Sequence, residues 1–151
     1  MVTLTSDVGT VDGFTINITG TAIQNLLPFG MNSIFQDDVS AGVWAAATMN
    51  ALDDSLFLFN SGDVVTPGTE TESATQLFGD ISVKGGTGLM SVDVARVVVP
   101  AGTAFNVAGT AAIDNGDLAE TFSAEVPEPA SISLLAFGSL VIFARRRVAR
   151  G

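Results

Sequence analysis

Apolar and polar positions alternate over several short stretches of the chain, and turn-forming residues separate these stretches. The clearest alternation places Phe14, Ile16 and Ile18 on one face of a half-buried strand. Asn115 and Gly116 favour the positive φ angles of a tight hairpin. Further apolar stretches bounded by Gly, Asn, Asp or Pro predict strands at residues 42–49, 55–59, 77–83, 90–99, 103–113 and 118–124.

Short strands at this spacing predict a mainly β fold, with an antiparallel β-sandwich or jelly roll as its architecture. The alanine-rich run 41–51 is predicted as a strand, although it also fits helical spacing at Val43, Ala46, Ala47 and Asn50. Residues 66–75 contain no large apolar side chain, so this segment is predicted as a solvent-exposed loop.

The final segment has a different pattern. Residues 130–144 contain no charged side chain and are apolar around the whole circumference of a helix, which favours a single lipid-facing transmembrane helix. Fifteen residues give about 22 Å of helix, against a hydrocarbon core of about 30 Å. Bilayer thinning and snorkelling of the arginines that follow reduce this difference.

Prolines and arginines flank the apolar run. Pro127 and Pro129 hold their predecessors in extended conformations, so residues 125–129 are predicted to form a stiff, exposed connector. The positive-inside rule keeps the arginines in the cytoplasm and leaves the rest of the chain outside. The arginines that anchor this topology are Arg145, Arg146, Arg147 and Arg150.

Charge divides the chain into two parts. Before Pro127 the only basic residues are Lys84 and Arg96, against fifteen carboxylates, so this body carries a net charge of −13. Binding to a phosphate backbone requires clustered Lys and Arg, and nucleic acid is therefore excluded as a partner. The body is equally unsuited to anionic lipid or anionic polysaccharide, whereas a cation or a basic protein fits its charge.

The chain contains no Cys, His or Tyr, which limits its chemistry. Without Cys and His it forms no disulfide, no ordinary zinc site and no Ser-His-Asp or Cys-His nucleophile pair. Trp44 is the only Trp and is expected in the core, so a glycosidase would lack an aromatic platform for its sugar. We therefore expect a protein that is not an enzyme and uses no cofactor.

Acidic pairs occur at residues 37–38, 53–54 and 114–117. Calcium takes several oxygen ligands from loops of this kind, but none of these has the spacing of an EF-hand or a nonapeptide calcium repeat. Asp and Asn also favour turns through local hydrogen bonds, so we predict solvated turns and no metal site.

Val126, Pro127, Glu128 and Pro129, followed by the apolar run and the arginine cluster, resemble the PEP-CTERM sorting signal. The resemblance covers about 26 of the 151 residues. It implies a passenger domain at 1–125 and a sorting signal at 126–151. In this family, bacteria that make extracellular polysaccharide export the protein and anchor it by this tail. A transpeptidase-like membrane enzyme, the exosortase, then processes it near the Pro-Glu-Pro.

We therefore expect an exported surface or extracellular-matrix protein that is held briefly in the inner membrane and delivered to the cell surface. The alternative is a secreted carbohydrate- or calcium-binding β-sandwich module. Residues 1–20 have neither the basic start nor the apolar core of a signal peptide. Export thus leads us to expect a signal peptide upstream of Met1 and a passenger truncated at its N-terminus.

Overall fold

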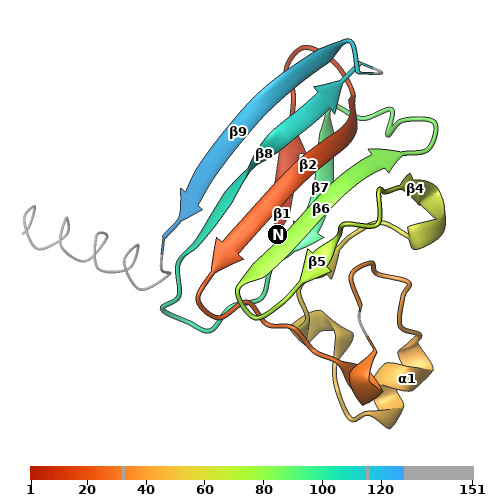
Figure 1. Ribbon diagram of the computed structural model, residues 1–151, viewed down its shortest axis with the longest axis vertical. Coiled ribbons are helices and arrows are strands. Elements are labelled where there is room, and N and C mark those ends of the chain that lie inside the picture. Colours follow the sequence, from red (N-terminus) through yellow and green to blue (C-terminus); the bar gives the residue numbers. More distant parts are fainter. Residues whose placement is uncertain (32, 115, 128–151) are drawn as a thin grey trace, which may run out of the picture.

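The computed structural model describes residues 1–31, 33–114 and 116–127. These residues form two antiparallel sheets (Figure 1). The smaller sheet has the order β1 (Val2–Thr5), β7 (Ser91–Arg96), β3 (Leu56–Phe57). The larger has the order β4 (Val64–Val65), β6 (Gln76–Val83), β2 (Val11–Gly20), β8 (Phe105–Ile113), β9 (Leu118–Val126), with β5 (Thr71–Glu72) also paired to β6. The predicted mainly β, antiparallel fold is confirmed.

The two sheets share one hydrophobic core. Figure 1 shows β1 and β7 lying behind the larger sheet. The inward residues of β2 predicted from alternation are buried, with Ile16 and Ile18 fully inaccessible. From the smaller sheet, Phe57 and Val94 are equally inaccessible and belong to the same cluster. Burial of these side chains is the main force that holds the sheets together.

Close packing explains one glycine in a strand of the larger sheet. The ring of Phe57 lies over Gly79 on β6, where an added Cβ would come 2.6 Å from a ring carbon. Phe57 also packs against Phe14 and Phe35, with ring centroids 6.4 and 6.1 Å away. Gly79 therefore makes room for the central aromatic residue of the core.

The predicted hairpin near the end of the body is confirmed. Ile113 on β8 pairs with Leu118 on β9. In the turn between them, Asp114 and Gly116 have φ angles of 54° and 86°. Residue 115, the Asn of the predicted turn, lies outside the described residues.

The strand predicted at 42–49 is wrong, because this segment contains the helix α1 (Ala41–Ala46). Alanine is the best helix former, and Trp44 is the one buried residue of the helix. A single apolar anchor suits a short helix docked by one side, whereas a half-buried strand would bury every second residue. Thr48, with a φ of 56°, follows the end of the helix.

Short 3-10 turns accompany α1 at Pro28–Gly30, Ala51–Asp53 and Ser61–Asp63. The strands predicted at 55–59 and 90–99 are present but shorter, as β3 and β7.

Two segments predicted as a loop and a connector take part in strand pairing, and Glu125 and Val126 are exposed, as predicted. The expected loop 66–75 includes β5, in which Thr71 pairs with Phe78 and Glu72 with Leu77. The expected free connector begins inside β9, because Glu125 pairs with Asn106 and Val126 with Phe105. In both cases a neighbouring strand supplies backbone partners that the local sequence does not reveal.

No helix formed by the described residues is long and apolar enough to cross a membrane. The transmembrane helix predicted at 130–144 lies outside these residues.

Candidate functional site

The structure places two of the predicted processing residues at the end of β9. Val126 is the last residue of the strand, and its side chain is 37% exposed. Pro127 follows directly and is exposed. Because proline has no backbone N–H, it cannot extend the pairing with β8. The other predicted site residues, Glu128, Pro129, Arg145, Arg146, Arg147 and Arg150, lie outside the described part of the chain.

β9 is an edge strand that is held mainly by its pairing with β8. Eight of its nine residues are exposed, and only Phe122 is partly buried. The Phe122 ring covers Gly109 on β8, where an added Cβ would lie 2.7 Å from a ring carbon. An aromatic side chain that covers a cross-strand glycine fixes the register of the pair. The chain thus enters the predicted processing segment directly from a weakly buried strand.

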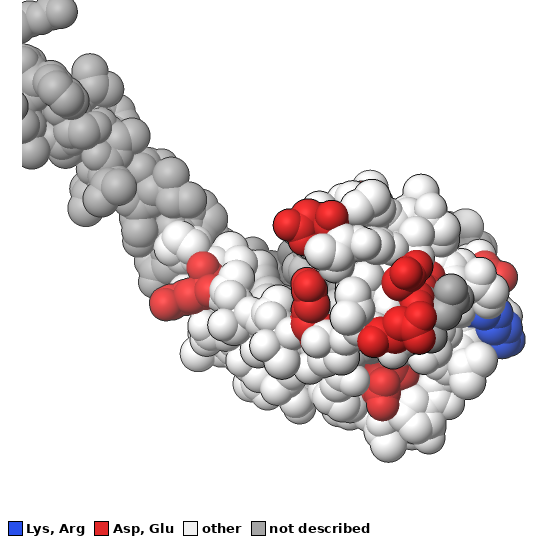
Figure 2. Space-filling model, turned by 90° about the horizontal axis from the view of Figure 1, so that it is seen from above, with Lys and Arg blue, Asp and Glu red and all other residues white. Residues whose placement is uncertain are grey.

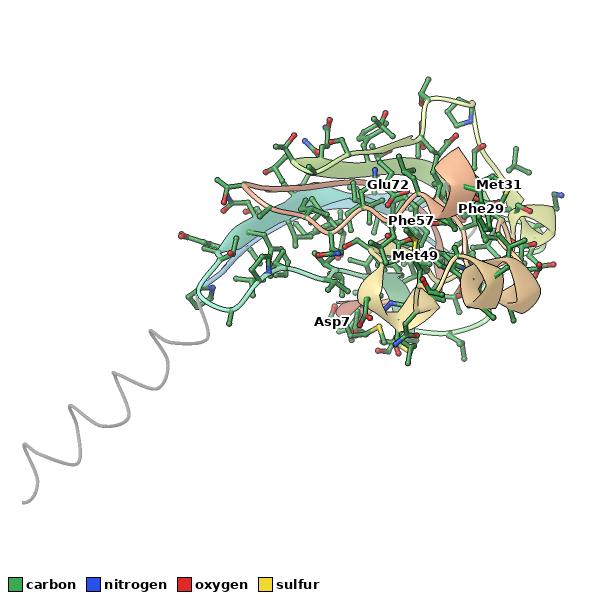
Figure 3. All side chains as sticks on the ribbon, turned by 90° about the horizontal axis from the view of Figure 1, so that it is seen from below. Asp7, Phe29, Met31, Met49, Phe57 and Glu72 are labelled. Carbon is green, nitrogen blue, oxygen red and sulfur yellow. The ribbon has the colours of Figure 1, made fainter. Side chains whose placement is uncertain are left out.

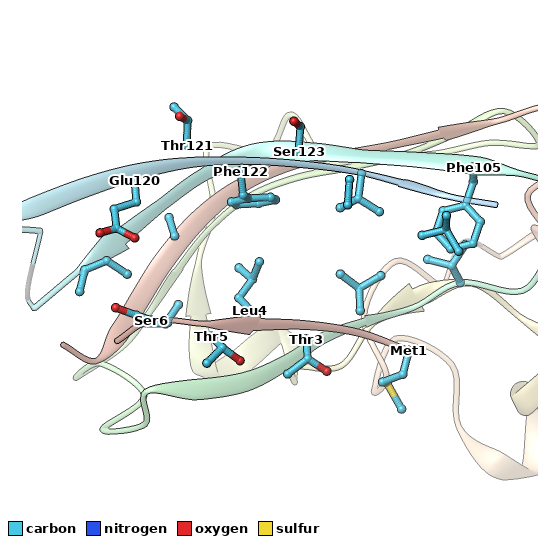
Figure 4. A pocket seen from close by; sticks show the side chains of 18 residues that line it. Met1, Thr3, Leu4, Thr5, Ser6, Phe105, Glu120, Thr121, Phe122 and Ser123 are labelled. Atoms are coloured by element: carbon cyan, nitrogen blue, oxygen red, sulfur yellow. The ribbon is translucent and has the colours of Figure 1, made fainter. Parts of the chain in front are cut away.

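A groove separates β9 from β1, which is the edge strand of the smaller sheet (Figure 4). Its volume is about 660 Å³. Figure 4 shows Glu120 and Phe122 pointing from β9 into this groove, while Thr121 and Ser123 point away. Glu120 is the one charged residue among those that line it. Its walls include the buried apolar residues Leu4, Val11, Val107, Ala111 and Ile113.

The acidic pair at 37–38 forms a solvated turn, as predicted. Asp37 is exposed and accepts hydrogen bonds from the backbone N–H (2.6 Å) and hydroxyl (3.1 Å) of Ser61. Asp38 is exposed and accepts from the backbone N–H of Phe35 at 2.8 Å. Figure 2 shows the acidic side chains of one face in several separate patches. The described residues include no group of three or more His, Cys, Asp or Glu able to hold a metal ion.

The prediction of a solvated turn is wrong for Asp54, which is completely buried. Its carboxylate accepts hydrogen bonds from the Ser33 hydroxyl and from the backbone N–H of Leu26, the latter at 2.8 Å. Burial raises the pKa of Asp54, and the hydrogen bond from Ser33 opposes that rise. Asp54 therefore joins chain segments distant in sequence, while its neighbour Asp53 is exposed as expected.

Glu72 on β5 lies beside Asp54, and sequence reasoning missed it. Glu72 is labelled in Figure 3. Burial, followed by the charge of Asp54, raises the pKa of Glu72 to about 8. Two neighbouring carboxyl groups with little access to water favour holding one proton between them. At neutral pH Glu72 is therefore mostly protonated.

Both basic residues of the body bind backbone carbonyls. The Arg96 guanidinium donates to the carbonyl oxygens of Asp54, at 3.0 Å, and of Ala51. The Lys84 ammonium donates to the carbonyl of Gly62 at 2.7 Å. Trp44 is buried, as expected, with 6% of its surface exposed. Hydrogen bonds to the backbone therefore give Arg96 and Lys84 a structural role, and burial gives one to Trp44.

Comparisons with curated proteins and with solved structures found no match. A family model does match, that of the PEP-CTERM protein-sorting motif, over residues 125–147. The match begins two residues before Pro127, inside β9. The chain therefore carries the PEP-CTERM protein-sorting motif, which supports an exported protein that is targeted to an exosortase.

Proposed function

We propose that the chain is a non-enzymatic surface or extracellular-matrix protein, with a β-sandwich passenger at 1–125 and a sorting signal at 126–151. The observation that carries this proposal is the sorting motif at 125–147. The lack of His and Cys throughout the chain supports a non-enzymatic role. The acidic surface of the body supports solubility outside the cell and contact with cations or basic proteins of the matrix.

In this proposal Val126, Pro127, Glu128 and Pro129 form the processing segment. The apolar run 130–144 holds the protein in the inner membrane until the exosortase acts. Arg145, Arg146, Arg147 and Arg150 keep the tail end in the cytoplasm. Exposure of Pro127 after an edge strand supports access by the enzyme, because the chain leaves the sheet at Val126.

The test is mass spectrometry of the protein recovered from the surface and medium of its native host. We expect a mature chain that ends near residues 127–129. Glu128→Ala combined with Pro129→Ala should leave the chain uncut and retained in the membrane fraction. A surface-delivered chain that still contains residues 130–144 would show that the motif does not direct processing, and the proposal would fail.

A further inference from the structure

The free edge of β9 provides a template for another strand. β9 pairs with β8 over all nine of its residues in one continuous register, and its opposite edge has no partner among the described residues. Long exposed strand edges pair with other chains unless prolines, bulges or opposed charges prevent it. β9 contains no proline and its pairing no bulge, so only its two glutamates could act against pairing.

The sequence of β9 is complementary to itself when two copies run antiparallel. Two-fold symmetry requires residues of the same face to lie opposite each other, and Phe122 is the central residue of Leu118–Val126. A two-fold axis at Phe122 is therefore the arrangement that pairs all nine residues. In it, Glu120 lies opposite Ala124 of the second copy. Glu125 lies opposite Ala119, so no glutamate opposes another.

The same register brings the apolar residues of the edge together. On the groove side, Phe122 lies opposite Phe122 of the second copy, and Leu118 lies opposite Val126. Leu118 and Val126 are 49% and 37% exposed in the single chain. The groove between β1 and β9 opens at this same edge, so the second copy would cover exposed apolar surface on both chains (Figure 4).

We propose that two copies of the chain associate through β9, in antiparallel register about Phe122, and join their larger sheets into one. Long-range charge opposes this association, because each body carries a net charge of −13. At physiological ionic strength such repulsion decays over a distance of about 8 Å. Added salt shortens this distance, so the dimer should become more stable as the salt concentration rises. The two processing segments leave the paired strands at opposite ends, about 26 Å apart at 3.3 Å per residue.

Cysteine cross-linking tests both the contact and its register, because the chain contains no cysteine of its own. In the proposed dimer Thr121 lies opposite Ser123, with Cβ atoms about 5 Å apart, close to the separation in a disulfide. Thr121 lies about 7–8 Å from its own copy in the partner, which is too far. Both side chains are exposed and point away from the groove.

Full-length Thr121→Cys and Ser123→Cys chains are purified separately in a non-ionic detergent and then mixed under mild oxidation. We expect a disulfide-linked dimer in the mixture and at least tenfold less in either variant alone. Equal cross-linking of each variant with itself would overturn the register. Absence of a cross-link in the mixture at several salt concentrations would overturn the association.

Charge substitutions at Ala124 give an independent test on an exposed residue. Ala124→Glu places like charges opposite Glu120, and Ala124→Lys places opposite charges there. Sedimentation of the full chain in density-matched detergent should show a weaker dimer for the first and a stronger one for the second. Thr69→Glu and Thr69→Lys, which change an exposed residue of another segment by the same charge, are the matched controls. If substitutions at positions 124 and 69 changed the stability of the dimer equally, net charge alone would explain the result, and the proposed contact would be refuted. The test does not depend on export or processing.

Discussion

The ring of Phe122 on β9 lies over Gly109 on β8, its directly opposite partner in the larger sheet. A Cβ at position 109 would come 2.7 Å from this ring and 2.0 Å from the carbonyl oxygen of Thr15 on β2. The glycine thus allows β2, β8 and the aromatic residue of β9 to approach closely. This contact ties the edge strand that leads to the sorting motif to the centre of the sheet.

Gly109→Ala should therefore destabilise the body strongly, because the backbone of β2 cannot move away as a flexible side chain could. We expect a loss of roughly 3 kcal/mol in the free energy of unfolding, at the upper end for overpacked sites. Urea unfolding of the full chain in detergent, followed by circular dichroism, measures it. Gly42→Ala is the control, since nothing lies within 4 Å of its added Cβ. In α1 it should be neutral or stabilising by up to about 1 kcal/mol. A similar small effect at both positions would contradict the packing argument.

The protonated state of Glu72 predicts a pH dependence of stability. Its pKa is raised from 4.5 to about 8 in the folded protein, so the folded state binds a proton that the unfolded chain releases above pH 4.5. The stability from this proton is complete below about pH 4.5 and is lost as the pH rises through 8. Because Glu72 is partly exposed, we expect about 1–2 kcal/mol over that range.

Glu72→Gln replaces the protonated acid with a neutral side chain of the same shape. Melting curves of the two proteins should agree most closely near pH 5 and separate toward pH 9, with the variant the more stable at high pH. Asp80→Asn is the matched control, because Asp80 is an exposed acid on the adjoining strand β6. Parallel pH profiles for the wild type and Glu72→Gln would contradict a raised pKa at this residue.

Arg96 should contribute more to stability than Lys84, although each is a basic residue bound to backbone carbonyls. Arg96 donates from two nitrogens to the carbonyls of Asp54 and Ala51, and so fixes the turn that presents the buried Asp54 carboxylate. Lys84 makes one exposed hydrogen bond. Charged hydrogen bonds contribute about 1.5–3 kcal/mol when buried, and exposed ones much less. Thermal and urea unfolding should show a loss of roughly 2 kcal/mol for Arg96→Ala and under about 0.5 kcal/mol for Lys84→Ala. Equal losses would refute the role of the two-carbonyl contact.

Sequence patterns predicted the long strands well and the short elements poorly. In β2 the alternation of Phe14, Ile16 and Ile18 is a local property, and it reports burial on one face directly. β3 and β5 have two residues each, which is too short for any period to appear. The alanines of α1 are small enough to suit a strand or a helix, so only the docking of Trp44 decides between them.

The buried carboxyl pair of Asp54 and Glu72 could not be predicted from the sequence, for a different reason. Asp54 follows Asp53 in what looks like an ordinary acidic turn, and Glu72 lies in a polar stretch with Glu70, Thr71 and Ser73 around it. Their burial depends on Ser33 and Leu26, which are more than 20 residues away along the chain. The sorting motif was predictable because its order of proline, apolar and arginine residues is local. Its overlap with β9 was not, since pairing with β8 determines where that strand ends.

This overlap leads to a prediction about processing. The sorting motif match starts at Glu125, yet Glu125 and Val126 are also the last paired residues of β9. Pro127 itself is exposed, but the two residues before it are held by pairing with β8, so an exosortase that binds an extended segment on both sides of Pro127 must compete with that pairing. Insertion of Gly-Ser-Gly-Ser between Val126 and Pro127 should then leave the body folded and increase the rate of processing in the native host. Pulse-chase labelling of the intact and trimmed chains measures this rate, and the same insertion between Gly68 and Thr69, two exposed residues before β5, is the control. A loss of processing on insertion before Pro127 would contradict this prediction. It would show that the enzyme recognises Glu125 and Val126 at their natural distance from Pro127, so that these two residues must first separate from β8.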